Sequence, residues 1–222
     1  MNLLFEDNHL IIVNKECGDL VQADPSGDVP LEQTVKDYLK EKYDKPGDVF
    51  LGVVHRVDRP VSGIVLFART TKAQLRLNRM FQEKLIRKTY WALVKELPPD
   101  EKGTLIHYII RNKKTKRSYA SFDERHGSKK AVLHYRHMAS SDRYHLLEID
   151  LETGRHHQIR CQLAAIGCPI RGDLKYGYPR SNPNGGISLH ARKIQFQHPV
   201  KNIEINIIAP LPDEPLWKIF DK

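Results

Sequence analysis

The chain has few cysteines and no long apolar run, and both absences limit what it can be. Its cysteines, Cys17, Cys161 and Cys168, are odd in number and form no Cys-x-x-Cys pair. We therefore expect neither a disulfide framework nor a structural zinc site, and a reducing compartment fits best. No apolar stretch approaches the ~20 residues that span a bilayer. Glu6 and Asp7 interrupt the N-terminus before a signal-peptide core could form, so we expect a cytoplasmic protein without membrane contact.

Histidine is plentiful, but its placement argues against a metal site. Of the 11 histidines, His156 and His157 lie close in sequence to Cys161 and come nearest to a ligand set. Adjacent residues on a helix point in different directions, so this pair is poorly suited to binding one zinc ion. The sequence therefore predicts no metal.

The balance of charge points to an acidic partner. Lysine and arginine number 36 against 27 aspartates and glutamates, which gives a net charge of +9. Nucleic acid is the first candidate partner; the alternative is a soluble protein that happens to be basic. At 40% hydrophobic residues the chain can bury a real core, and it shows no repeat or low-complexity linker. We expect one compact domain over residues 1–222, present as a monomer.

Hydrophobic periodicity predicts three helices and a series of strands. Helical spacing covers residues 30–43, 72–84 and 155–166. In the second helix we expect Leu75, Leu77, Met80 and Phe81 to be buried. Between residues 104 and 151 strands follow strands without helices, which favours an antiparallel sheet. We therefore expect an α+β fold, a mainly antiparallel mixed sheet with flanking helices. The predicted strands are 3–5, 10–13, 50–54, 64–67, 88–94, 104–110, 118–122, 131–138, 144–151, 187–196 and 202–208.

The segment 55–63, HRVDRPVSG, gathers reactive side chains between two apolar runs. It contains one carboxylate, Asp58, with one imidazole and the guanidinium groups of Arg56 and Arg59. A loop held by two buried strands is a rigid platform for chemistry. The alternative is a plain strand connection in which Asp58 caps a turn and pairs with an arginine.

Two further segments are basic. Residues 153–160, TGRHHQIR, lie at the start of a predicted helix, a position suited to anions, with Arg155 and His157 as candidate contacts of the substrate. The alternative is a capped basic helix on the surface. Residues 111–117 lie in a predicted turn, where we favour phosphate contact over a merely solvated loop. The candidate contacts in this turn are Lys113, Lys114, Lys116 and Arg117.

Segments 55–63 and 153–160 together resemble signatures of the RluA-type family of RNA pseudouridine synthases. The first resembles H-R-L-D-R-x-T-S-G, with Val57 in place of Leu and Val61 in place of Thr; the second resembles T-G-R-x-H-Q-I-R. The tripeptide at 88–90 is similar to the family's K-x-Y, and shorter echoes follow at 170–173, 176–177 and 189–191. The resemblance covers residues 3–208. Many relatives carry a small N-terminal RNA-binding module, which we expect to be absent here.

The resemblance implies the pseudouridine synthase catalytic fold and the isomerisation of uridine in ribosomal or transfer RNA, without a cofactor. It implies that Asp58 is the catalytic carboxylate and that Arg160 pairs with it. It implies that Tyr90 stacks against the target base. Arg56 would then fill the gap left by a flipped nucleotide or grip its phosphate.

The chemistry of these residues agrees with that mechanism. Breaking a glycosidic bond calls for a carboxylate as nucleophile or as electrostatic stabiliser, and a hydrolase would usually pair two carboxylates. Asp58 stands alone among arginine and histidine, which favours a base that leaves, turns and rejoins through carbon. Attack at the ribose carbon and attack at uracil carbon 6 both remain open. The alternatives are a non-catalytic RNA-binding or RNA-folding protein on the same scaffold, and a glycosylase with Asp173 as second carboxylate.

Overall fold

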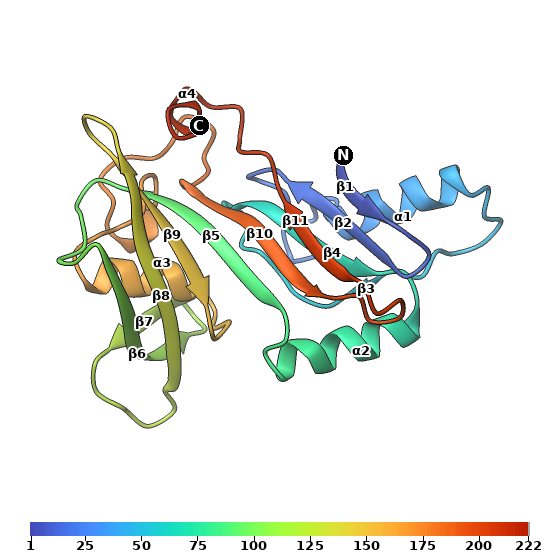
Figure 1. The fold of residues 1–222 in the computed structure, drawn as a ribbon, viewed down its shortest axis with the longest axis horizontal. Helices are drawn as coiled ribbons and strands as arrows, with labels where there is room; N and C mark the ends of the chain where they lie inside the picture. The colour runs from blue at the N-terminus through green and yellow to red at the C-terminus, as the bar shows by residue number, and fades with distance from the viewer. Residues whose placement is uncertain (222) are drawn as a thin grey trace. The chain divides into compact units, whose positions relative to one another are not determined.

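The computed structural model describes residues 1–221 and divides into two compact units. Unit 1 comprises Met1–Ile86 and Ala191–Pro212, and unit 2 comprises Arg87–His190 with the tail from Asp213. Each unit contains strands and helices of its own (Figure 1). The expectation of a single catalytic domain is not decided by this division and stays a prediction.

Unit 1 is built on a sheet whose two central strands are mostly apolar. Strands β2 and β4 pair antiparallel, and every residue of β4 is buried. The strand order is β1-β2-β4-β10, with β3 paired to β4 and β11 to β10. Continuous burial explains why β4 reads as an unbroken apolar run rather than an alternating one. The strands are β1 Asn2–Glu6, β2 Leu10–Lys15, β3 Gly52–Val53, β4 Ser62–Ala68, β10 Leu189–Gln197 and β11 Glu204–Ile208.

The prediction of a strand over residues 50–54 is wrong in length, because β3 covers only Gly52–Val53. Only the two residues of β3 pair with β4, and Phe50 just before them is 44% exposed. An aromatic residue beside a buried segment indicates a strand by composition, but pairing depends on a partner with free backbone groups. β4 is already paired with β2 and β10, and β3 pairs only with its last two residues, Phe67 and Ala68.

Two helices belong to unit 1, α1 at Leu31–Lys42 and α2 at Thr71–Gln82. The N-cap of α2 is Thr70, whose Oγ1 accepts a hydrogen bond from the backbone N–H of Ala73 at 3.1 Å. The predicted buried face is wrong at Leu75, which is 66% exposed, whereas Ala73 and Leu77 are fully buried. Residues two apart on a helix lie on opposite sides, so Leu75 could not share a face with Leu77.

Unit 2 is a meander of long antiparallel strands in the order β5-β9-β8-β6-β7. Its centre is apolar: Leu93, Leu133 and Leu147 are fully buried. The predicted antiparallel arrangement of residues 104–151 is confirmed, as is the α+β fold class. The strands are β5 Arg87–Val94, β6 Lys102–Asn112, β7 Arg117–Ser121, β8 Lys129–Ser140 and β9 His145–Leu151.

Helix α3, Gln158–Ala165, packs against β6 and β7 of unit 2 (Figure 1). The prediction that this helix begins at Arg155 is wrong, because His157 has a left-handed backbone with φ of 53°. That conformation cannot continue an α-helix, so α3 begins one residue later. The short helices η1, Leu174–Tyr176, and α4, Pro215–Lys218, follow.

The C-terminal tail buries two aromatic side chains, since Trp217 and Phe220 are 2% and 7% exposed. The three cysteines form no disulfide within the part of the chain that the structure describes. Across residues 1–221, no helix is both long and apolar enough to traverse a lipid bilayer.

Candidate active site

In unit 1, the loop 55–61 closes into a tight turn just before β4. The backbone N–H of Val61 donates to the carbonyl of Asp58 at 3.0 Å. Two residues further, Gly63 has φ of +110°, and a Cβ there would overlap the backbone of Ala191. Only glycine both adopts this backbone angle without strain and leaves room for the backbone of Ala191. The turn and the glycine therefore fix Asp58 at the mouth of a fully buried strand.

Lys15, at the end of β2, lies beneath this turn and is 1% exposed. Its Nζ donates to the carbonyls of Glu16 at 2.7 Å, Arg59 at 3.0 Å and Val61 at 2.7 Å. Burial lowers the pKa of Lys15 to about 8, so the amine is still protonated at neutral pH. One buried ammonium group therefore ties together the backbone on both sides of Pro60.

The side chains of the loop differ in exposure. Asp58 is half-buried, whereas Arg56 and Arg59 are exposed. The Nη2 of Arg59 lies 2.7 Å from Oδ2 of Asp28, and both side chains are about half exposed. An exposed pair of this kind contributes little to stability. Arg59 therefore lies at the surface in a weak ion pair.

In unit 2, the segment 153–160 begins as a turn built around Gln158. The Oε1 of Gln158 accepts hydrogen bonds from Oγ1 of Thr153 at 2.8 Å and from the backbone N–H of Arg155 at 2.9 Å. Arg155 itself is exposed, and its Nε donates to the carbonyl of Lys130 at 3.1 Å. The predicted anion-binding residue Arg155 thus lies on a braced turn ahead of α3, not within the helix.

Arg160 points into unit 2 from α3 and is 5% exposed. Its Nε lies 2.7 Å from Oδ2 of Asp173, and its Nη2 lies 2.9 Å from Oδ1 of the same carboxylate. This is a bidentate, almost fully buried pair, since Asp173 is 1% exposed. The expected pairing of Arg160 with Asp58 joins residues of different units and stays a prediction.

His157 is held on two sides within unit 2. Its Nδ1 lies 2.8 Å from the hydroxyl of Tyr176, and its ring stacks on that of His156 at 3.8 Å between centroids. Burial lowers the pKa of His157 to about 2, with smaller contributions from neighbouring cations, Arg160 foremost. The imidazole is therefore neutral at any physiological pH.

Tyr90 lies in β5, opposite Ile149 of β9, and is 8% exposed. Its position in β5 fits the predicted strand 88–94. Its role as a stacking partner of the target base stays a prediction.

The basic run 111–117 forms the turn between β6 and β7, as predicted. The Oδ1 of Asn112 accepts hydrogen bonds from the backbone N–H groups of Lys114 and Thr115, which shapes the turn. Lys113, Lys114 and Lys116 are exposed. Arg117 is half-buried, with its Cζ 5.1 Å from the centre of the Tyr176 ring.

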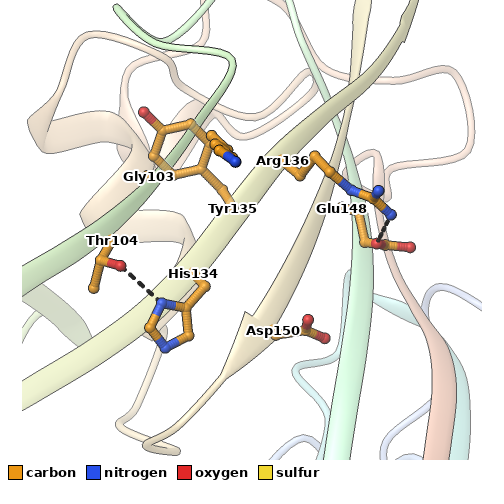
Figure 2. A pocket seen from close by; sticks show the side chains of 8 residues that line it. Gly103, Thr104, His134, Tyr135, Arg136, Glu148 and Asp150 are labelled. Atoms are coloured by element: carbon orange, nitrogen blue, oxygen red, sulfur yellow. Dashed lines mark hydrogen bonds and ion pairs between the residues drawn. The ribbon is translucent and has the colours of Figure 1, made fainter.

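A surface hollow of about 400 Å³ lies on the solvent face of unit 2 and holds none of the predicted site residues (Figure 2). Arg136 donates to Glu148 across it at 2.8 Å, and Thr104 bonds Nδ1 of His134 at 2.8 Å (Figure 2). Charges of both signs are paired within the hollow. It therefore lacks the excess of positive charge that a phosphate backbone requires.

No three His, Cys, Asp or Glu side chains gather into a possible metal site within residues 1–221. His156 and His157, the candidates in the sequence, turn their Nδ1 atoms to Ser118 and Tyr176 respectively.

The loop 55–63 and the segment 153–160 both lie within a match to a known protein family. The family model described as RNA pseudouridylate synthase matches residues 9–165, which include both segments. The chain belongs to the RNA pseudouridine synthase family. The isomerase class expected from the sequence is thereby confirmed, and RNA is the substrate class of that family.

Curated relatives and solved structures agree with membership of the RNA pseudouridine synthase family. The chain is 34% identical over 217 residues to the uncharacterized RNA pseudouridine synthase YhcT of Bacillus subtilis, covering 96% of this chain and 69% of the relative. It is 34% identical over 229 residues to ribosomal large subunit pseudouridine synthase D of Vibrio cholerae, covering 96% and 68% respectively. The structure of human RNA pseudouridylate synthase domain containing 4 matches with a TM-score of 0.79 at 22% identity, covering 96% of this chain and 89% of that one. The last likeness concerns the fold alone.

Sequence reasoning missed three features of this pseudouridine synthase. Lys15 carried one signal, a lysine at the end of an otherwise apolar strand. Asp173 was considered only as the second carboxylate of a glycosylase, whereas the structure pairs it with Arg160. Tyr176 was noted only as an echo of the family pattern, and nothing in the sequence indicated its contact with His157.

Proposed function

We propose that this chain isomerises uridine to pseudouridine in ribosomal or transfer RNA, with Asp58 as the catalytic carboxylate. The observation that carries the proposal is the position of Asp58 in a turn that Lys15 and Gly63 hold rigid ahead of a buried strand. A carboxylate that must meet one carbon of a flipped nucleotide benefits from such restraint. No sequestered second carboxylate is needed, because the reaction consumes no water.

The proposed division of roles follows the resemblance and the charges. Asp58 attacks the ribose carbon or uracil carbon 6, Arg160 holds it ionised, and Tyr90 stacks on the base. The phosphates on either side are bound by cationic side chains and by the neutral imidazole of His157, and these contacts offset the few kcal/mol that extrusion of the base costs. The proposed contacts are Arg56, Arg59, Arg155, His157, Lys113, Lys114, Lys116 and Arg117.

We also propose that the chain acts as a monomer in the cytoplasm. Ribosomal and transfer RNA are made and modified there in bacteria, the source of the two curated relatives compared above. Size-exclusion chromatography with light scattering tests the first part of this statement. A stable dimer would contradict it.

The test of the activity uses RNA labelled with tritium at carbon 5 of uracil, prepared from a strain that lacks the gene. We expect tritium in water, no free uracil, and one or a few modified positions on mapping. Free uracil would instead show a glycosylase. No release from RNA that the protein still binds would show a non-catalytic RNA-binding protein.

A further inference from the structure

The hydroxyl of Tyr176 is held on two sides, next to the proposed contact residue His157. It accepts a hydrogen bond from the backbone N–H of Ser118 at 2.8 Å and lies 2.8 Å from Nδ1 of His157. Tyr176 is 5% exposed, and burial raises the pKa of its phenol to about 12. The hydroxyl therefore keeps its proton and must place it on an acceptor.

That acceptor is the Nδ1 atom of His157. A tyrosine oxygen has two lone pairs and one proton, and the N–H of Ser118 already occupies one lone pair. If Nδ1 also donated, the phenol proton would have to bond elsewhere. Among the contacts described for Tyr176 within residues 1–221, no other acceptor occurs. Leaving a buried donor unbonded is costly, so the proton of Tyr176 lies toward Nδ1.

We infer that Tyr176 is a positioning residue, which fixes His157 as the neutral tautomer that carries its proton on Nε2. The use that we assign to this tautomer, binding of the RNA, rests on the proposed function. Phosphate oxygens and uracil carbonyls are acceptors, so a ring with Nε2–H can bind either, whereas the opposite tautomer can bind neither through Nε2.

The surroundings hold this state against protonation. Arg160, His156, Lys175 and Arg111 lie close enough to the imidazole to lower its pKa, and the hydroxyl of Tyr176 lies at its Nδ1 atom. Positive neighbours and burial both oppose a second proton on the ring. The stack on His156, whose Nδ1 bonds Oγ of Ser118 at 2.8 Å, fixes the plane of the ring as well.

The same tyrosine ring contacts two guanidinium groups. The Cζ atoms of Arg160 and Arg117 lie 5.0 and 5.1 Å from its centre, within the range of cation–π attraction. Tyr176 therefore holds two of the proposed RNA-facing or catalytic side chains in place besides His157.

The direct test is a proton–nitrogen correlation spectrum of the parent protein labelled at the histidine ring nitrogens. The signal of His157 is assigned by its absence from the His157→Gln variant. We expect an unprotonated Nδ1 and a protonated Nε2 between pH 5 and 8. A protonated Nδ1, or a doubly protonated ring in that range, would overturn the inference. This reading needs no substrate, so it stands even if the parent forms no pseudouridine and the proposed function fails.

Two variants test the consequence for activity. Tyr176→Phe should lower single-turnover pseudouridine formation about tenfold, the effect of one well-placed hydrogen bond, and should leave His157 as a mixture of tautomers. Tyr178→Phe is the matched control, because Tyr178 is also buried and bonds the hydroxyl of Tyr144 instead. Equal activity of Tyr176→Phe and Tyr178→Phe would contradict the inference.

Two replacements of His157 distinguish a role as hydrogen-bond donor from a role in the left-handed backbone conformation. Its left-handed backbone favours asparagine over glutamine. Glutamine, however, carries its amide N–H₂ close to the place of Nε2, whereas asparagine reaches only the place of Nδ1. We expect His157→Gln to retain more activity than His157→Asn, although His157→Asn should be the more stable fold. Higher activity of His157→Asn would show a merely structural residue.

Discussion

Replacing Lys15 by methionine should destabilise unit 1 by about 3 kcal/mol. Three hydrogen bonds from an ammonium group, at about 2 kcal/mol each, favour the folded state by about 6 kcal/mol. Burial lowers the pKa of Lys15 from 10.5 to about 8, and at about 1.4 kcal/mol per pH unit the buried charge costs about 3 kcal/mol. Lys15→Met should remove the difference between these two free energies, because methionine fills the space of lysine but has no hydrogen-bond donor.

Urea unfolding followed by circular dichroism measures this loss. A thermal melt should show a fall of about 6–12 °C, given 2–4 °C per kcal/mol for a chain of this size. Lys45→Met is the matched control, since Lys45 is exposed, and it should change stability by less than about 0.5 kcal/mol. A loss for Lys15→Met no larger than for Lys45→Met would refute the reasoning.

The same lysine predicts how stability depends on pH. Its folded pKa, about 8, lies below its unfolded value of 10.5, so between these values the unfolded chain binds more protons. Stability of the parent relative to Lys15→Met should therefore rise from pH 8 to pH 10. A relative stability that falls over this interval would show that the ammonium form is the favoured one inside the fold.

Three further changes test other parts of the account. Asp173→Asn should cost about 3 kcal/mol in a thermal melt, because asparagine keeps the shape but cannot balance the buried charge of Arg160; a loss independent of salt is expected, and a loss below about 1 kcal/mol would contradict it. Thr70→Ala should cost about 1 kcal/mol by urea unfolding, and Thr70→Ser nearly nothing, if the side-chain cap stabilises α2. Lys113→Gln combined with Lys114→Gln should lower the slope of log affinity for RNA against log salt by roughly 1.5, as measured by titration; an unchanged slope would show that these lysines do not reach phosphates.

Much of the fold could be predicted because its signals are local. The strands of unit 2 alternate over long stretches and are separated by polar turns, so the meander of residues 104–151 follows from the order of residues alone. The cap at Thr70 is likewise a pattern of neighbouring residues. Where the pattern that defines a strand, turn or cap lies within a few neighbouring residues, it can be recognised in the sequence alone.

The errors arose where the local geometry of the chain overrides its hydrophobic pattern. Residues 155–157 follow a helical pattern, yet Gln158 binds back to Thr153 and His157 turns left-handed, which delays the start of α3. Leu75 was assigned to a buried face by its hydrophobicity, although its angle around the helix excludes that. In both cases geometry, not composition, decided the outcome.

The candidate site likewise contains some residues that a sequence motif reveals and others that only the fold reveals. The signature around Asp58 and the segment ending at Arg160 were visible as motifs, because their chemistry lies in consecutive residues. The groups that brace them lie far away in sequence: Lys15 is 44 residues from Arg59, and Asp173 is 13 residues from Arg160. Only the fold brings such groups to the motifs.

The central claim is that Asp58 is the catalytic carboxylate, and one measurement tests it most directly. The parent, Asp58→Asn and the exposed control Asp48→Asn are incubated in excess over RNA labelled with tritium at carbon 5 of uracil. We predict tritium release by the parent and by Asp48→Asn, and none by Asp58→Asn, with all three binding the RNA equally. Release by Asp58→Asn at the rate of the parent would contradict the account.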